Sequence, residues 1–254
     1  TIVGGEHGDG WHTRADNTGF ERTLGAFLPR SSVAYRVGDS GVSLRASAYG
    51  GFRAPPLNEL YRGFRVGNTV TNPNEALEPE RLKGFEGGVL ASRGRVSARV
   101  TGFWSTLDEA VSNVTVSSTS SLITRQRRNA DEQRASGVEF EAELALPRAV
   151  TVGFAGAVIA SHFKGQTDLR DKRVPQVAKY NLAFTARYQE RGWTGSGQVR
   201  VTGPQFENDQ NTLTLRRATV LDLHGGRDVV NHVPNVIGVV TGSASPSVAR
   251  IARR

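Results

Sequence analysis

The sequence predicts an all-β protein whose antiparallel strands run up and down along the chain. Three observations carry this prediction. Apolar and polar residues alternate over most of the 254 residues, no long segment shows a helical period, and short and long connections between the alternating segments follow one another in turn. An alternation with period two places every second side chain on the same face of a sheet.

The alternation identifies the strands in order along the chain. It is clearest over residues 42–49, 95–102, 138–144, 152–158 and 182–188, and it continues at 199–201, 213–215 and 218–223. The surrounding segments 95–110, 134–146 and 178–189 have the length of membrane-crossing strands, which need about 9–11 residues, whereas strands of soluble sandwiches average about 5–6. We therefore expect long strands, about nine or ten in all.

The connections fall into two classes. Short turns rich in Gly, Pro and Asp occupy residues 38–41, 92–94, 147–148 and 190–192, and long polar connections occupy 51–80, 112–123, 164–177 and 203–211. Short turns at one end of a sheet and long loops at the other are typical of transmembrane β-barrels, with the turns on the periplasmic side and the loops on the extracellular side.

The polar positions of the predicted strands help to choose between a barrel and a soluble sandwich. They carry many charged side chains, including Arg45, Arg99, Glu139, Glu141 and Arg187. A wide aqueous lumen accommodates such charges, with apolar side chains facing lipid. We favour the barrel, and keep as the alternative a soluble or surface-attached β-sheet binding module of the adhesin type, in which the apolar face packs against a second sheet.

Composition excludes several other classes. With no Cys there is no disulfide framework, thiolate metal site or cysteine nucleophile. The net charge is +8, but the basic residues, 28 Arg and 4 Lys, are spread along the whole chain rather than clustered, so we expect no nucleic-acid partner. No segment reads as a transmembrane helix or a signal peptide, and because Met is absent even at position 1 we expect a mature chain or a fragment.

The end of the sequence differs from the rest. Alternation continues to Leu223 and stops at His224. We therefore divide the chain into a partial β-barrel over residues 1–223 and an irregular tail over 224–254, and we expect the tail to be disordered or to result from a frameshift.

Several motifs resemble the β-barrel of TonB-dependent outer-membrane receptors. In that family an FRAP box ends a strand, an Asn-Glu-Leu-Tyr segment follows, and an Asn-Pro-x-Leu-x-Pro-Glu box precedes a strand with a Glu-x-Gly element. Here the first box is Phe52, Arg53, Ala54 and Pro55; the second runs from Asn72 and Pro73 to Pro79 and Glu80, with a two-residue insertion; and Glu86-Gly87-Gly88 follows. Residues 135–139 and 174–175 resemble two further family elements, although the second proline of the latter is absent.

The resemblance implies uptake of a scarce nutrient, most often a ferric siderophore, across the outer membrane of a Gram-negative bacterium, energised by the inner-membrane TonB complex. It also implies a barrel of 22 strands with a plug domain. The present chain holds part of such a barrel and no plug, so we expect a fragment that is inactive alone. A transporter of this kind is not an enzyme, and no nucleophile elbow or convergent set of titratable groups argues otherwise.

The candidate ligand-binding residues lie in the long connection between the two boxes. Tyr61, Arg62 and Arg65 offer phenol and guanidinium groups that suit anionic, oxygen-rich siderophores. The alternative is that they are solvated or hold the loop against the wall of the barrel. No His lies in residues 53–72, which argues against haem. We expect no metal site and no cofactor, because the acids and histidines near residues 6–16 match no metal motif.

The densest basic cluster is Arg125, Arg127 and Arg128. On a barrel strand that leaves a loop, these residues would line the lumen or bind lipopolysaccharide phosphates, and the sequence does not distinguish the two.

Overall fold

The computed structural model describes the backbone of residues 2–15, 20–129, 132–165, 168–227 and 240–244, and the side chains that fall between Phe27 and Arg227 in these ranges. Its main feature is one antiparallel sheet of eleven strands with the order β1-β2-β3-β6-β7-β10-β11-β12-β13-β16-β17. The strands are β1 (Ile2–Ala15), β2 (Phe20–Arg36), β3 (Val42–Arg53), β6 (Glu80–Arg93), β7 (Val96–Asp108), β10 (Glu132–Leu146), β11 (Val150–Lys164), β12 (Tyr180–Glu190), β13 (Trp193–Thr202), β16 (Ala218–Arg227) and β17 (Val240–Ala244).

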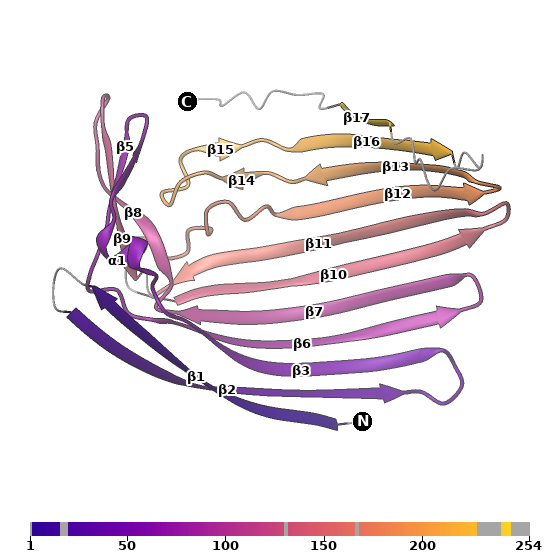
Figure 1. Cartoon of the computed structure of the whole chain (residues 1–254), viewed down its shortest axis with the longest axis horizontal. Helices are drawn as coiled ribbons and strands as arrows, with labels where there is room; N and C mark the ends of the chain where they lie inside the picture. Colours follow the sequence, from indigo (N-terminus) through magenta and orange to yellow (C-terminus); the bar gives the residue numbers. More distant parts are fainter. Residues whose placement is uncertain (1, 16–19, 130–131, 166–167, 228–239, 245–254) are drawn as a thin grey trace, which may run out of the picture.

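Each strand pairs with the next long strand of the chain, which confirms the predicted up-and-down architecture (Figure 1). The sheet is curved and, over the described residues, not closed. Short turns join the strands at one end, which we call the turn end, and the long connections emerge at the other, which we call the loop end. Gly41 ends one of these turns with φ of +75°, and the neighbouring strand β6 approaches it so closely that a Cβ there would lie 2.1 Å from the carbonyl oxygen of Ser92.

The sequence predicted nine or ten strands and the sheet has eleven. Among the additional strands are β1, whose glycines and charged residues show no alternation, and β17, which lies beyond the predicted barrel. Both are recognisable only from their pairing with β2 and β16. β16 itself continues to Arg227, past Leu223, because it pairs with β13 over its whole length. The domain boundary at residue 223 stays a prediction.

The long connections also form structure of their own, where the sequence predicted only loops. They contain helix α1 (Leu57–Tyr61), a four-stranded sheet of order β4-β5-β9-β8, and the short pair β14-β15. The strands are β4 (Phe64–Val66), β5 (Thr69–Asn72), β8 (Val111–Ser118), β9 (Ile123–Asn129), β14 (Gln205–Phe206) and β15 (Thr214–Leu215). The four-stranded loop sheet stands beyond the loop end of the main sheet (Figure 1).

The two faces of the main sheet differ sharply in polarity. Strand register defines rows of side chains that share a face. One row comprises Val33, Ala46, Gly87, Gly102, Val138, Val158 and Tyr180. A row on the opposite face comprises Ala34, Arg45, Gly88, Thr101, Glu139, Ala157 and Asn181. The first face is apolar and the second carries the charges.

The apolar face is uncovered. Val138, Val158 and Phe184 are 44%, 54% and 54% exposed, and they are typical of the large apolar side chains on this face. In water such a face would be an aggregation hazard, whereas in a bilayer it would meet hydrocarbon. No second sheet packs on it among the described residues, which argues against a sandwich.

The charged face holds ion pairs and a shallow cavity. Arg200 lies 2.8 Å from Asp222, and the Ser47 hydroxyl donates to Glu86 at 2.7 Å. A cavity of about 540 Å³ on this face is lined by Arg45, Arg99, Glu139 and Glu141, among other residues. This is the polarity predicted for an aqueous lumen.

The assignment of the faces can be tested with two arginine substitutions. Val138→Arg places a charge near the middle of the apolar face, and we expect it to lower the free energy of unfolding in lipid vesicles by about 2–4 kcal/mol. The matched control Ala157→Arg places the same side chain opposite Glu139 on the charged face and should cost much less. Guanidinium titration of both variants measures the difference, and equal losses would mean that the faces are wrongly assigned.

Candidate functional site

The connection between β3 and β6 brings the two sequence boxes together at the loop end. Arg53, the last residue of β3, pairs in register with Glu80, the first residue of β6. Its Nε donates to Glu80 Oε2, and its Nη1 donates to Glu59 of α1 at 3.2 Å. Glu80 Oε1 accepts the backbone N–H of Val111 at 2.7 Å. The Arg53–Glu80 pair therefore fixes the ends of two barrel strands to α1 and to the start of β8.

The remainder of the second box is also buried in loop contacts. Leu77 is fully buried, and Pro79 is buried beside it in the sequence. Asn74 donates from its backbone to Glu59 O at 3.1 Å and from its side chain to Arg127 O at 3.0 Å. These contacts make the box a structural junction between α1 and the loop sheet.

Asn129, at the end of β9, fastens the same connection to the next one. Its Oδ1 accepts the N–H of Glu78 at 2.8 Å, and its Nδ2 donates to the carbonyls of Glu78 and Glu109 at 2.9 and 2.6 Å. One side-chain amide thus satisfies backbone groups of two connections at once.

The three arginines of the basic cluster have different surroundings, and they lie on β9 of the loop sheet rather than on a barrel strand. Arg127 is buried: it donates to the carbonyls of Asn58 and Arg62, the latter at 3.2 Å, and lies 5.2 Å from the centre of the Phe64 ring. Since the carbonyls at the C-terminus of a helix attract cations, Arg127 stabilises α1. Arg128 is exposed and contacts Gln126 at 2.8 Å. Arg125 is half-buried, and its Nε has no hydrogen-bond partner among the described residues.

The three ligand-binding candidates lie close together in sequence but face different surroundings. Tyr61 ends α1 with its hydroxyl buried. Arg62 follows the helix and Arg65 lies on β4, and both side chains are exposed. Arg65 Nε donates to Gly67 O at 2.9 Å, which orients the guanidinium without burying it. The structure therefore leaves two guanidinium groups on the surface of the segment that joins α1 to β4.

The other long connections interlock through an aspartate that sequence reasoning did not single out. Asp209 is 3% exposed and accepts three hydrogen bonds: from Thr115 N at 3.1 Å, Thr115 Oγ1 at 2.8 Å and Gln210 Nε2 at 3.0 Å. Asn211 exchanges two hydrogen bonds with the backbone of Arg173, at 2.7 and 3.0 Å. These contacts join the connections that follow β7, β11 and β13.

A small apolar cluster supports this junction. Phe163 and Leu169 are almost fully buried, and Val114 and Val174 pack against them. At the surface of the same region Lys164 lies 2.6 Å from Asp171 and lowers the pKa of that carboxyl below its usual range. The long connections thus pack against one another and form one layer.

Among the residues whose placement is described, no three His, Cys, Asp or Glu side chains gather to hold a metal ion. The acids and histidines at residues 6–16, considered from the sequence, lie outside the described side chains. No helix in the described part of the chain is both long and apolar enough to cross a membrane.

Comparisons with known proteins relate this architecture to a family of β-barrels. A family model described as "TonB dependent receptor-like, beta-barrel" matches residues 2–239. The vitamin B12 transporter BtuB of Photobacterium profundum is 24% identical over 201 residues, which are 76% of this chain and 30% of the relative.

Solved structures share the fold at low sequence identity. The copper transporter OprC has a TM-score of 0.74 at 17% identity, covering 90% of this chain and 37% of its own. The ferric citrate transporter FecA has a TM-score of 0.68 at 17% identity, covering 91% and 35%. The FrpB iron transporter of Neisseria meningitidis has a TM-score of 0.64 at 16% identity, covering 89% and 36%. The chain spans about a third of the length of these relatives.

The different roles of the two neighbouring arginines predict different responses to mutation. Arg127→Gln removes the donors to Asn58 and Arg62, and at about 1.5–3 kcal/mol for each charge-assisted bond we expect backbone amides of residues 57–66 to exchange at least tenfold faster. The control Arg128→Gln loses the same charge from an exposed position and should change little. Hydrogen exchange with mass spectrometry measures both, and equal exchange rates in the two variants would contradict the role given to Arg127.

The buried aspartate gives a second test of the loop layer. Asp209→Asn replaces an acceptor of three hydrogen bonds by an amide, and we expect a local loss of about 1–3 kcal/mol, seen as faster exchange at Thr115 and over residues 203–217. Asp168→Asn, an exposed carboxylate in the connection after β11, is the control. Unchanged protection of Thr115 in Asp209→Asn would exclude a contribution of Asp209 to the interlocking.

Proposed function

Because the chain belongs to the TonB-dependent receptor-like β-barrel family, we propose that it forms part of an outer-membrane transporter for an anionic metal chelate, most specifically a ferric siderophore. The family comprises transporters and receptors of the Gram-negative outer membrane rather than enzymes. The whole transporter would receive energy from the TonB complex through a plug domain.

The observation that carries the choice of ligand is the pair of exposed guanidinium groups at Arg62 and Arg65. They lie on the segment from the end of α1 to β4, at the loop end, where an incoming ligand would first meet the protein. This segment is held in place by Arg127, which donates to the carbonyl of Arg62, and by the Arg53–Glu80 pair. A pre-organised cationic surface suits an anionic, oxygen-rich chelate, because guanidinium groups form strong paired hydrogen bonds with carboxylate and phenolate oxygens.

Tyr61 has a different role in this proposal. Its side chain is half-buried and its hydroxyl is enclosed. In this proposal Tyr61 therefore supports the segment from α1 to β4 and does not contact the ligand. We therefore assign recognition to Arg62 and Arg65, and support to Tyr61.

The relatives described above are named for different cargoes, which are copper, ferric citrate, iron and vitamin B12. A vitamin such as B12 depends less on a cationic surface than a ferric chelate with several carboxylate or catecholate groups. The exposed arginines therefore favour the ferric chelate, the kind of cargo named for FecA.

The proposal predicts a specific uptake defect. In an iron-starved host that expresses the protein in full, Arg62→Gln with Arg65→Gln should raise the KM for uptake of a radiolabelled ferric chelate about tenfold, as expected when two charge-assisted contacts are weakened. Arg93→Gln with Arg95→Gln removes the same charge at the turn end and serves as the control.

Uptake should also stop when the TonB complex is deleted. Labelled ferric citrate, a catecholate siderophore and a hydroxamate siderophore are assayed in parallel with labelled vitamin B12. Uptake of the vitamin alone, or an unchanged KM for every ferric chelate in the Arg62/Arg65 variant, would overturn the assignment of the ligand.

A further inference from the structure

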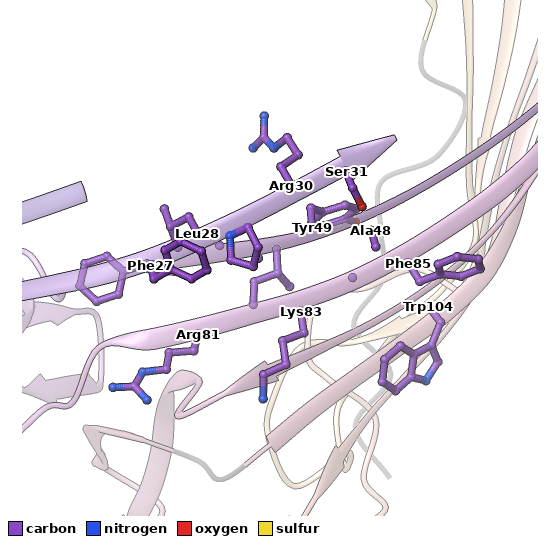
Figure 2. Close-up of a pocket in the computed structure, with 16 residues that line it drawn as sticks. Phe27, Leu28, Arg30, Ser31, Ala48, Tyr49, Arg81, Lys83, Phe85 and Trp104 are labelled. Atoms are coloured by element: carbon purple, nitrogen blue, oxygen red, sulfur yellow. The ribbon is translucent and has the colours of Figure 1, made fainter. Parts of the chain in front are cut away.

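The apolar face of the main sheet carries a second cavity, close to the loop end. It has a volume of about 1120 Å³ and lies over β2, β3, β6 and β7. Aromatic and basic side chains border it together, including Phe27, Phe85 and Trp104 with Arg81 and Lys83. Figure 2 shows Arg81, Lys83 and Trp104 leaving their strands on one side, with Arg30 on the other.

Strand register assigns these basic residues to the face that would meet lipid. Arg81 and Lys83 alternate with Leu82 on β6 and share their face with Phe85 and Val89. Their partners on β3 are Phe52 and Gly50. They are therefore cations on an otherwise apolar surface, where a charge is costly unless it lies at the boundary with water.

Their height on the sheet places them at that boundary. Arg81 and Lys83 lie within the first four residues of β6, directly below the loops. At the opposite border Trp193 lies under Arg227, 4.7 Å from the guanidinium carbon to the ring centre. Aromatic side chains at both borders are typical of the girdles of membrane barrels, so the pocket lies where lipid headgroups begin.

The charges in and beside the pocket are only partly balanced. Lys83 lies 3.0 Å from Asp108, but its side chain is 71% exposed, so this pair is weak and can be replaced by a stronger partner. The side chain of Arg81 makes no hydrogen bond or ion pair with any described residue, although Asp108 is its cross-strand neighbour on β7. Arg134 lies over the Trp104 ring at 6.0 Å and contacts Glu132 at 2.8 Å. Three cations therefore face two carboxylates.

We propose that this pocket binds a phosphorylated lipid, with the headgroup phosphate on Arg81 and Lys83 and an acyl chain along Phe27, Phe85 and Trp104. Gly50 is the partner of Lys83 on β3, and because a Cβ there would lie only 3.1 Å from Pro29 Cδ, a larger residue would crowd Pro29 beside Lys83. The ligand differs in chemistry and position from the transported chelate. The membrane orientation on which it depends rests on the proposed function.

The occupant follows from this combination of charge and hydrophobicity. A free phosphate would gain nothing from the aromatic border, and an uncharged lipid would gain nothing from Arg81 and Lys83. A lipid with phosphates at the water boundary satisfies both, since each basic residue near such a headgroup contributes about 1 kcal/mol, which is about fivefold in affinity. Lipid A, with two phosphates and several acyl chains, has this chemistry.

Native mass spectrometry of the complete protein, purified from outer membranes in a non-ionic detergent, tests the proposal. The probes are bisphosphorylated lipid A, its dephosphorylated form and inorganic phosphate. We expect the wild type to retain bisphosphorylated lipid A, and Arg81→Gln with Lys83→Gln to bind it at least tenfold more weakly. Arg93→Gln with Arg227→Gln, which removes two cations at the turn end, is the matched control and should bind as the wild type does.

Three results would overturn the proposal: equal affinity of the Arg81/Lys83 variant, equal binding of the dephosphorylated lipid, or an equal loss in the turn-end control. Membrane fractionation of each variant separates this inference from the proposed function. If the wild-type protein enters the outer membrane and transports its ligand but does not select the phosphorylated lipid, the lipid pocket alone is refuted. If the wild-type protein is absent from the outer membrane, both the lipid pocket and the proposed function are refuted.

Discussion

The constraint on which the structure depends is the pairing of backbone groups within a surface that would lie in hydrocarbon. A bilayer offers no water to an unpaired N–H or C=O group, so a chain that crosses it repeatedly must satisfy them between strands. The continuous ladder from β1 to β17 does this along the sheet. Once the ladder is fixed, the pleat assigns alternate residues to two solvents, and a single strand such as β10 presents Val138 to one and Glu139 to the other.

At the loop end the backbone groups lack a continuous ladder, and side chains form hydrogen bonds with them instead. Asn129, Asn74 and Asp209 each bind groups from a different connection, and Glu80 accepts the N–H of Val111 as well as the Arg53 guanidinium. A buried polar side chain of this kind is favourable only when its bonding capacity is used. The consequence is a layer of loops held in defined positions, on which Arg62 and Arg65 are exposed.

Sequence reasoning succeeded where the physics is periodic and local. The alternation located β7, β10 and β12 closely, and glycine-rich turns located the hairpins, because both signals depend on neighbouring residues. It failed for the loop sheet, since β5 pairs in parallel with β9, more than fifty residues away, and nothing local encodes that contact. It also treated Arg125, Arg127 and Arg128 as one cluster, although only the fold decides which of them is buried.

The role of each arginine depends on its position in the fold, and the large number of arginines alone does not predict it. Arg127, enclosed by helix carbonyls and a ring, stabilises a loop. Arg62, whose backbone carbonyl accepts a hydrogen bond from Arg127 at 3.2 Å, has an exposed side chain. Arg81 shares the same end of the sheet but emerges on the apolar face, where its charge suits a phosphate at the edge of a lipid layer. One residue type thus supports the loops and, in the two proposals made above, serves recognition and membrane contact, because the sheet and its loops would provide three environments with different dielectric properties.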